Sequence, residues 1–564
     1  MTKKDIINLL ETIATYMELS LENPFKVSAY RKAAAAIERD PRALSEIEDF
    51  SEMKGIGKGV NDVITEYVET GRSSILDDLK ETVPVSLVQM LKLPTLGPKK
   101  IAKLHKELGV VTLEGLKAEC VAGNVSELSG FGKKTEDNIS KAIDELLTRP
   151  ETYPIEKIQT FRKIIEASLD EITGIDRYDI AGSARRYKEM SKDLDFIVQT
   201  TDAHSVAEAL VNLPFVKDVV ARGERKLSVV IAHDLDQIGV DIRFVTAEAY
   251  HTTLHHFTGS KEHNVKMRQI AKSRGEKVSE YGVEKEGELL TFESESDFFS
   301  HFDLPYIAPT MRETGEETDI EVSDIVTLDD IRGDLHMHTV YSDGAHSVRE
   351  MVEACIDKGY DYMIITDHSK SLRVANGLDE DRLWQQIEEI KKIRPEYPGI
   401  DIYTGTEMDI LKDGSLDFSE DMLKELDYVI AAIHSSFQQT EDEIMHRLRS
   451  ACENPYVRHI AHPTGRLIGG RAGYAVDFEK LIQMSKDTRT VMEVNANPRR
   501  LDLSSSVIRN SGLMLTVNTD AHHTQHLEFM EYGTATLQKG LIEKHQVINT
   551  FSREDFREWV KKGK

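Results

Sequence analysis

The chain has 564 residues, with 40% hydrophobic and 30% charged content and a formal net charge of −27. This length exceeds one hydrophobic core, and no apolar run is long enough to cross a membrane, so we expect several soluble domains and exclude a membrane-spanning protein. The N-terminus lacks a signal-peptide core, and Cys120, Cys355 and Cys452 lack disulfide or metal-ligand spacing, so we expect a cytoplasmic protein with reduced thiols.

Helical patterns fill the first 148 residues, among them Asp5–Leu19 and Ser28–Ile37. Three further predicted helices begin at a glycine turn flanked by lysine, namely Gly55-Ile56-Gly57-Lys58, Thr95-Leu96-Gly97-Pro98-Lys99 and Gly130-Phe131-Gly132-Lys133. Such a turn directs free N–H groups toward an anion, although glycine also serves ordinary turns and lysines also cluster on solvated helix faces. Three copies together favour contact with a phosphate backbone, despite the acidic total charge.

The three turns resemble the helix-hairpin-helix motif, which grips the DNA backbone without reading its sequence. The resemblance implies DNA contacts at Gly55, Gly57, Lys58, Gly97, Lys99, Gly130, Gly132 and Lys133. Thr95 replaces the first glycine of the second copy, so we expect that copy to bind phosphate least firmly. We expect one helical domain at residues 1–80 and a helix-hairpin-helix subdomain at residues 81–148.

From about residue 149 the pattern changes to short strands around a helix, and three aspartates stand out. Asp193 and Asp195 are two residues apart in a strand, so both side chains point to the same face. The predicted strands that follow are Val216–Arg222, Lys226–Ala232 and Gly239–Val245. The last strand contains Asp241, the third carboxylate that a two-metal site for phosphoryl transfer needs. The alternative is that these aspartates lie in turns or at strand edges.

Donors suited to a polyphosphate precede the aspartates. Gly182 and Ser183 form a predicted turn, and Arg185 and Arg186 follow it. Backbone N–H groups, a hydroxyl and guanidinium groups together can bind phosphate oxygens. Carboxylates that face such a turn indicate phosphoryl or nucleotidyl transfer.

These motifs resemble those of family X DNA polymerases, and His256-Phe257-Thr258-Gly259-Ser260 followed by Asn264 and Arg268 resembles that family's nucleotide-binding stretch. The resemblance implies an α+β nucleotidyltransferase palm at residues 149–250, similar to that of polymerase beta, and a nucleotide-binding subdomain at residues 251–315. His256 stands where the family commonly has tyrosine, and Lys261 where polymerase beta has an acid. Both positions bear on sugar discrimination and base-pair fidelity.

The resemblance also implies residue roles. Asp193 and Asp195 would hold two Mg²⁺ (or Mn²⁺) ions, and Asp241 would bind the catalytic ion and help deprotonate the primer 3′-hydroxyl. Arg268 would contact the templating strand. The implied nucleotide-binding residues are Gly182, Ser183, Arg186, His256, Phe257, Gly259 and Asn264.

Residues 1–80 resemble the lyase domain of the same family, whose nucleophilic lysine forms a Schiff base with a deoxyribose remnant. Aligned on Gly55-Ile56-Gly57, the position of that lysine is Val63. Valine has no amine, so we predict that the chain has no efficient lyase activity by the usual route.

An acidic stretch at 316–330 predicts a linker, and a second catalytic domain follows at residues 331–564. His336 and His338 lie on one face of a predicted strand, with Asp343 soon after. Further short apolar runs end in His368, Glu407, His434, His462, Asp520 and His522. Strands that alternate with helices and end in polar side chains predict an α/β barrel, here a distorted, TIM-like (βα)₇ barrel.

This domain resembles the PHP (polymerase and histidinol phosphatase) family. The resemblance implies a site for up to three ions of Mn²⁺, Zn²⁺ or both, with Glu407 between two of them. Such ions lower the pKa of bound water and polarise a phosphoryl group. Arg466, Arg471 and Arg499 are candidate phosphate contacts, with ordinary surface arginines as the alternative.

The sequence therefore predicts a bacterial family X DNA polymerase fused to a PHP domain with metal-dependent 3′–5′ exonuclease activity and a further candidate activity as an AP endonuclease. We expect it to fill short gaps in base excision repair, as a monomer, with gapped or nicked duplex DNA and dNTPs as partners. One alternative makes the barrel a small-molecule phosphatase or pyrophosphatase. Another makes the chain a non-catalytic DNA-binding scaffold, which the three palm aspartates disfavour.

Overall fold

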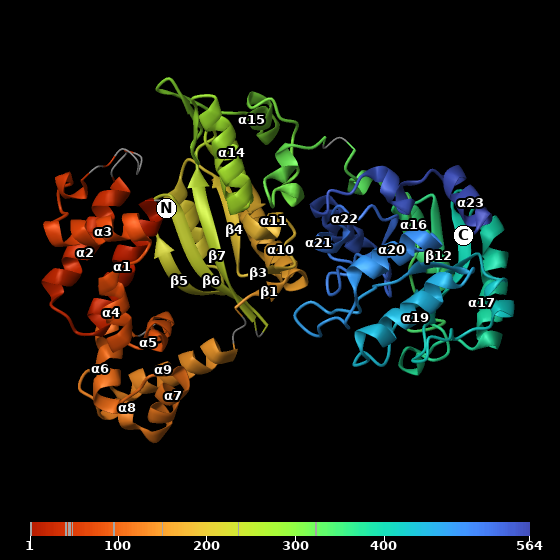
Figure 1. Ribbon diagram of the computed structural model, residues 1–564, viewed down its shortest axis with the longest axis horizontal. Coiled ribbons are helices and arrows are strands. Elements are labelled where there is room, and N and C mark those ends of the chain that lie inside the picture. The colour runs from red at the N-terminus through yellow and green to blue at the C-terminus, as the bar shows by residue number, and fades with distance from the viewer. Residues whose placement is uncertain are drawn as a thin grey trace. The chain divides into compact units, whose positions relative to one another are not determined.

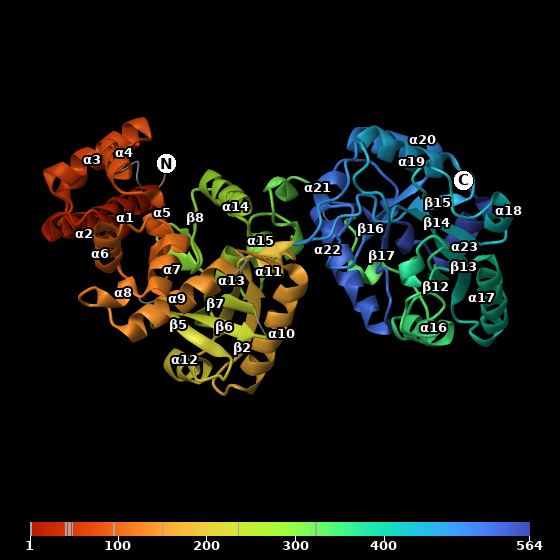
Figure 2. The same cartoon turned by 90° about the horizontal axis from the view of Figure 1, so that it is seen from below.

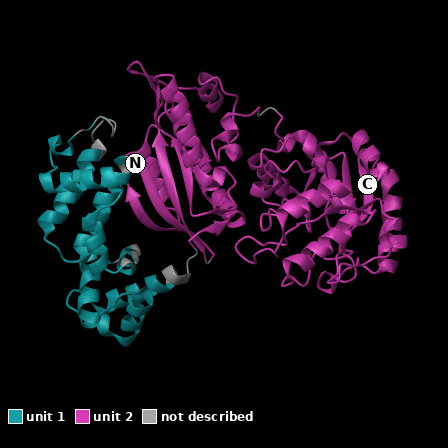
Figure 3. Cartoon of the chain, viewed as in Figure 1, with its two compact units in different colours: residues 1–150 teal, residues 151–564 magenta. Residues whose placement is uncertain are grey.

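The computed structural model describes residues 3–39, 42, 47, 49–93, 96–148, 151–234, 236–321 and 324–564. The chain forms two compact units, residues 1–150 and residues 151–564 (Figure 3). None of the helices in these ranges is long and apolar enough to cross a membrane. Thr95 lies outside the described residues.

The first unit is helical (Figure 1). Its described residues form two hydrophobic cores. Ile13 and Ile64 lie in the core that α1, α2 and α3 share, and Leu104 and Ile139 lie in the core of the later helices. The helices are α1 (Lys3–Leu19), α2 (Pro24–Arg39), α3 (Lys58–Thr70), α4 (Ser74–Thr82), α5 (Val85–Gln89), α6 (Pro98–Leu108), α7 (Leu113–Ala122), α8 (Asn124–Glu127) and α9 (Lys133–Thr148).

The palm is a five-stranded sheet in the order β2-β4-β7-β6-β5. Its strands are β2 (Arg177–Ala181), β4 (Asp193–Gln199), β5 (Val216–Arg222), β6 (Lys226–His233) and β7 (Asp236–Val245). Leu194, Phe196 and Val198 pack against α10 (Ile155–Glu171) and α12 (Ala203–Val211). Because side chains alternate along a strand, Asp193 and Asp195 point to the opposite face of the sheet. A short pair, β1 (Tyr153–Pro154) and β3 (Met190–Ser191), lies beside this sheet.

The next subdomain packs helices against a small antiparallel sheet. The sheet consists of β8 (Lys277–Val278), β9 (Val283–Lys285) and β10 (Glu288–Leu290). The helices are α13 (Tyr250–Thr258), α14 (Lys261–Ser273) and α15 (Glu295–His301). Phe298, Phe299 and Met267 form its core. Ser260 caps α14 by accepting a hydrogen bond from the His263 N–H, which fixes the turn between α13 and α14.

The C-terminal part contains seven parallel strands in sequential order, and the fold-class prediction is confirmed (Figure 2). An isolated bridge between Met337 and Ala521 joins the segments that follow the first and the last strand, so the barrel is nearly closed. The strands are β11 (Gly333–Asp334), β12 (Tyr362–Ile365), β13 (Asp401–Asp409), β14 (Tyr428–Ala432), β15 (Val457–Ile460), β16 (Val491–Asn495) and β17 (Leu515–Asn518). The helices are α16 (Val348–Asp357), α17 (Glu380–Ile393), α18 (Glu420–Leu423), α19 (Glu441–Glu453), α20 (Phe478–Thr488), α21 (Ser505–Ile508), α22 (Met530–Lys539) and α23 (Arg553–Lys562).

The sequence predicted that His336 and His338 lie within a strand. In the structure they follow the strand, because β11 ends at Asp334. Side chains hold the backbone there, since the Leu335 N–H donates to Asn518 Oδ1 at 3.0 Å and the His336 N–H donates to Asp334 Oδ1 at 3.3 Å. Both histidine side chains are nevertheless fully buried, with ring centroids 5.2 Å apart.

Candidate active sites in the palm and the barrel

The three palm aspartates lie together because β4 and β7 are parallel neighbours. Asp195 is directly opposite Asp241, and Asp193 is opposite Gly239. Burial, followed by the charges of Asp193 and Asp241, raises the pKa of Asp195 to about 7. Burial and the charge of Asp241 also raise the pKa of Asp193. The geometry thus concentrates negative charge that a divalent cation would neutralise.

Asp241 has partners that the other two aspartates lack. Lys226 Nζ lies 2.7 Å from Asp241 Oδ2, and Ser228 Oγ donates to Oδ1 at 2.6 Å. Both partners are on β6, which pairs with β7 in antiparallel register. Sequence reasoning missed them, although the alternation of Lys226 and Ser228 on a predicted strand places both on the face that carries the aspartates.

The segment 182–186, which we call the phosphate loop, begins directly after β2, and residues Gly182–Arg185 form the one-turn helix α11 instead of the predicted turn. Gly182 has φ +63°, and a Cβ there would overlap the Asp195 carboxylate. Only glycine permits this close approach of the loop to β4. Ser183 Oγ donates to Ser191 Oγ at 2.8 Å, so the predicted phosphate donor is held beside the aspartate strand.

The structure gives Arg186 protein partners that the sequence did not reveal. Arg186 is only 7% exposed, its Nε donates to Glu313 Oε1 at 3.1 Å, and its Nη1 donates to the Thr258 carbonyl at 2.7 Å. The neighbouring Arg185 donates to Thr258 Oγ1 and to Glu295. The arginines of the phosphate loop therefore join the palm to the following subdomain, and phosphate binding by Arg186 stays a prediction.

The predicted nucleotide-binding residues after the palm occupy α13, α14 and the turn between them. Asn264 Nδ2 donates to the His256 carbonyl at 2.8 Å, and a Cβ at Gly259 would lie 2.8 Å from Asn264 Oδ1. The Arg243 guanidinium lies 3.8 Å from the centre of the Phe257 ring, which joins this turn to the strand that carries Asp241. Arg268 is exposed on α14, as a contact with a template strand requires.

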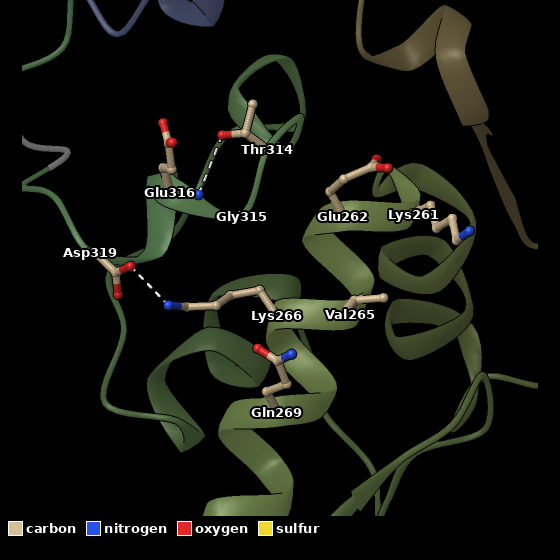
Figure 4. A pocket seen from close by; sticks show the side chains of 9 residues that line it. All are labelled: Lys261, Glu262, Val265, Lys266, Gln269, Thr314, Gly315, Glu316 and Asp319. Atoms are coloured by element: carbon tan, nitrogen blue, oxygen red, sulfur yellow. Dashed lines mark hydrogen bonds and ion pairs between the residues drawn. The ribbon is translucent and has the colours of Figure 1, made fainter. Parts of the chain in front are cut away.

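A surface pocket of about 340 Å³ lies beside α14 and away from these residues (Figure 4). Lys266 Nζ is 2.8 Å from Asp319 Oδ2, and the Glu316 N–H donates to Thr314 Oγ1 at 3.3 Å. Lys261 and Glu262 also line it, so cations and carboxylates offset one another there. The pocket lacks the concentrated charge that marks the palm.

The three glycine turns of the first unit share one arrangement. Their central apolar residues, Ile56, Leu96 and Phe131, are buried. Their exposed residues are Gly55, Gly57, Lys58, Gly97, Lys99, Gly130, Gly132 and Lys133. The apolar residue anchors each turn while the N–H groups and lysines face solvent, which suits a phosphate backbone.

Two details modify the predictions for the first unit. Lys133 Nζ lies 2.7 Å from Glu136 Oε1, so this lysine already has an anionic partner. Val63 packs against the N-terminal core and supplies no amine at the position of the family's lyase nucleophile.

The nine predicted barrel ligands converge at the carboxyl ends of the strands, and we call them the barrel cluster. Its centre is Glu407, which is 1% exposed. Glu407 Oε1 lies 2.8 Å from His462 Nε2 and 3.2 Å from His434 Nε2. Its other oxygen, Oε2, lies 2.8 Å from His368 Nδ1 and 3.4 Å from His336 Nε2. One carboxylate thus faces imidazoles on both oxygens, the position expected of a group between two ions.

The remaining ligands form the other half of the cluster. His338 Nε2 lies 3.2 Å from Asp520 Oδ1, and His522 Nε2 lies 3.3 Å from Asp343 Oδ1. The ligand atoms of His338, Asp343, His368 and His522 all lie within 4.8 Å of one another. Asp343 is 37% exposed and marks the open side of the cluster.

Charges within the cluster hold these groups in complementary protonation states. Burial raises the pKa of Glu407, but the imidazoles of His434, His336 and His368 outweigh it and hold that pKa well below its usual range. Burial lowers the pKa of His434, but the Glu407 and Asp409 carboxylates outweigh it and raise the pKa to about 10. A divalent cation would displace such protons when it binds.

A metal fits the buried atoms of this cluster. His336 Nε2, Glu407 Oε2 and His434 Nε2 are buried and have no well-formed hydrogen bond. Buried nitrogen and oxygen atoms without such partners are costly unless a ligand satisfies them. Imidazole nitrogens and carboxylate oxygens are also the donors that Mn²⁺ and Zn²⁺ take.

Sequence reasoning missed the carboxylates that orient the histidines. His434 Nδ1 bonds Asp409 Oδ1 at 2.7 Å, and His336 Nδ1 bonds Glu493 Oε1 at 2.8 Å. Such contacts fix the ring orientation of a metal-binding histidine. Two sequence patterns could have identified these carboxylates. Asp409 follows Glu407 by two residues and so lies on the same face of β13, and Glu493 is a charged residue within an apolar run.

The three candidate arginines of the barrel have different surroundings. Arg466 bonds Glu189 of the palm, with Nη2 2.7 Å from Oε1, so its role there is to join palm and barrel. Arg499 is exposed. Arg471 lies 3.9 Å from the centre of the Phe437 ring and donates to the Gly465 carbonyl at 2.9 Å.

The palm carboxylates and the barrel cluster are two separate groups of side chains, each of which could hold divalent cations, as in enzymes that transfer phosphoryl groups. Four family models match the chain: a helix-hairpin-helix domain at residues 1–73, a SAM-like helix-hairpin-helix tandem at 88–145, a DNA polymerase beta thumb at 253–313 and a PHP domain at 334–496.

A relative from Bacillus subtilis strain 168, the DNA polymerase/3'-5' exonuclease PolX, is 51% identical over the whole length of both chains. Probable phosphatases match a smaller share of the chain. One from Thermoanaerobacter sp. strain X514 is 27% identical over 38% of this chain and 89% of its own length, and one from Acetivibrio thermocellus is 26% identical over 41% and 95%. The chain belongs to the family X DNA polymerases that carry a C-terminal PHP domain.

Proposed function

We propose that the palm extends DNA primers and that the barrel removes nucleotides from DNA 3′ ends. The observation that carries the proposal is the register of β4 and β7, which places Asp193, Asp195 and Asp241 together beside the phosphate loop. The barrel cluster contributes a second centre with its ligands in contact. The name of the Bacillus subtilis relative, a polymerase with 3′–5′ exonuclease activity, supports both assignments.

In the palm, the positions of Asp241, Ser183 and Arg186 support a separate role for each side chain in nucleotide addition. Asp241 accepts the proton of the primer 3′-hydroxyl, while Ser183 and the N–H groups of the phosphate loop bind the triphosphate. Arg186 exchanges its bond with Glu313 for a phosphate oxygen. Mg²⁺ or Mn²⁺, held by the three aspartates, would supply charge neutralisation at the transferring phosphate.

In the barrel, the side chains of the cluster would hold Mn²⁺ or Zn²⁺, which would supply an activated water and charge neutralisation next to the scissile phosphodiester. The half-exposed Asp343 lies on the side from which a DNA end enters. The same site would cleave at abasic positions, because that reaction also hydrolyses a phosphodiester. Such an end-cleaning activity complements the absence of a lysine at Val63.

The cellular role that we propose is short-gap filling in base excision repair. The exposed glycine turns bind the backbone of gapped or nicked duplex DNA, and the palm inserts dNTPs. We expect a cytoplasmic monomer.

A second candidate function concerns the barrel alone. The probable phosphatases that match about two fifths of the chain favour hydrolysis of a small phosphate ester by the barrel. The two candidates differ in product, because a nuclease releases mononucleotides from a labelled 3′ end and a phosphatase releases inorganic phosphate.

The test uses the full chain on gapped duplex DNA in Mg²⁺ and, separately, in Mn²⁺. The double variant Asp193→Ala/Asp195→Ala should stop primer extension and keep nucleotide release, whereas His336→Ala/His338→Ala should do the reverse. Each variant is therefore the control for the folding of the other. Extension by the palm variant, or nucleotide release by the barrel variant, would contradict the corresponding assignment.

A further inference from the structure

A layered stack of side chains lies beside the barrel cluster. The Phe437 and Tyr474 rings are parallel within 11°, with centroids 5.8 Å apart. The Arg471 guanidinium carbon lies 3.9 Å from the centre of the Phe437 ring. Tyr474 is buried, Phe437 is half-buried and Arg471 is exposed. The stack therefore presents a planar cation to solvent.

The stack adjoins two ligands of the cluster. Phe437 follows His434 by three residues, and Gly465 follows His462 by three residues in a turn closed by a 2.9 Å hydrogen bond from the Gly465 N–H to the His462 carbonyl. A Cβ at Gly465 would lie 3.2 Å from Phe437 Cε1. Arg471 also donates a hydrogen bond to the Gly465 carbonyl at 2.9 Å, which connects it to the same turn. The planar cation is thus fixed to the turns that hold two ligands.

A second arginine adds positive charge on the same side. Arg500 Nε lies 3.5 Å from Asp520 Oδ2. Its charge lowers the pKa of Arg471, after the larger effect of burial. Arg500 is 20% exposed, so it can reach a phosphate at the cluster. The planar guanidinium of Arg471 could stack on the base of a nucleotide, and Arg500 could bind the phosphate of the same nucleotide.

We propose that Arg471, supported by Phe437, stacks on the base of the 3′-terminal nucleotide, while Arg500 positions its phosphate at the barrel cluster. The ligand class is single-stranded DNA with a free 3′ end. Guanidinium planes stack on bases of any type, so the site selects an unpaired end and not a sequence. This inference rests on the proposed exonuclease function of the barrel.

The experiment compares two oligonucleotides that differ only in whether the 3′-terminal residue carries a base or is an abasic tetrahydrofuran. The readout is the ratio of kcat/KM values for release of the terminal residue by the full chain. In the wild type the base should raise kcat/KM about 10- to 100-fold. Arg471→Ala should reduce the ratio toward one, and Arg471→Lys should do the same because it keeps the charge but not the plane. Phe437→Leu should lower the ratio in part.

Arg449→Ala, at an exposed arginine of α19, is the matched control and should keep the wild-type ratio. Metal content is measured for every variant. An equal fold-loss of kcat/KM on both substrates in Arg471→Ala would show that Arg471 only supports the His462 turn. An unchanged kcat/KM on both substrates would show that Arg471 does not contact the base. Either result would overturn the inference, whereas a wild type that releases no nucleotide from either substrate would instead contradict the exonuclease assignment.

Discussion

Asp195→Asn should stabilise the metal-free protein while it abolishes primer extension. The folded environment raises the Asp195 pKa from its ordinary value near 3.8 to about 7, chiefly through burial and then through Asp193 and Asp241. Each pKa unit corresponds to about 1.4 kcal/mol, so ionised Asp195 lowers the free energy of unfolding by up to about 4 kcal/mol. The neutral amide avoids this cost, and we expect a gain of about 2–4 kcal/mol at pH 8.

The gain should depend on pH with a definite sign. Below pH about 4 the carboxyl is protonated in both the folded and the unfolded protein, so the substitution gives no advantage. Between pH 4 and 7 the unfolded chain ionises and the folded one does not, so the wild type progressively loses stability. Above pH 7 the full difference in the free energy of unfolding between Asp195→Asn and the wild type is present. Thermal unfolding in EDTA across this range measures it.

Asp241→Asn is the matched control, because Lys226 and Ser228 already pair with that carboxylate and the amide would lose the ion pair. It should give a smaller gain than Asp195→Asn, because the loss of the ion pair offsets the relief of Asp193 and Asp195 from the Asp241 charge. Mg²⁺ should raise the melting temperature of the wild type and not that of Asp195→Asn, since the ion binds the folded aspartates. An Asp195→Asn variant without added stability at pH 8 in EDTA, or with a gain that does not change with pH, would refute the reasoning.

Three further predictions test other parts of the chain. Gly182→Ala places a Cβ against the palm carboxylate at positive φ, so primer extension should fall at least about 100-fold while nucleotide release by the barrel continues. Asp409→Asn weakens the orientation of His434 and should reduce metal affinity of the barrel about 10- to 100-fold, measured by metal titration. Arg466→Ala removes the ion pair with Glu189 and should lower the stability of residues 151–564 by about 1–3 kcal/mol in urea unfolding, more than Glu189→Gln does.

The structure brings together the side chains that the sequence selected as metal-ligand candidates, because both groups follow local patterns in the sequence. Period-two spacing placed Asp193 and Asp195 on one face, and polar residues at the ends of apolar runs marked the barrel cluster. Strand boundaries followed the same patterns, since β5 runs from Val216 to Arg222 as predicted. The roles assigned to these residues stay predictions that the experiments above test.

Local sequence patterns could not predict contacts between segments that are distant in the sequence. Glu313 lies 127 residues from Arg186, and no local spacing reveals that a thumb carboxylate binds an arginine of the phosphate loop. The same holds for Arg466, which pairs with Glu189 across 277 residues. The position of His336 beyond β11 was also missed, because the side chains of Asn518 and Asp334 replace the strand ladder there.

The pairing of β4 with β7 has a practical consequence for protein engineering. Seven consecutive residue pairs join these strands, from Asp193–Gly239 to Gln199–Val245, and set the spacing of the three aspartates. The turn between β5 and β6, at residues 223–225, lies outside that ladder, and β5 is an exposed edge strand of the sheet. A peptide tag inserted in this turn should therefore leave the spacing of the three aspartates unchanged.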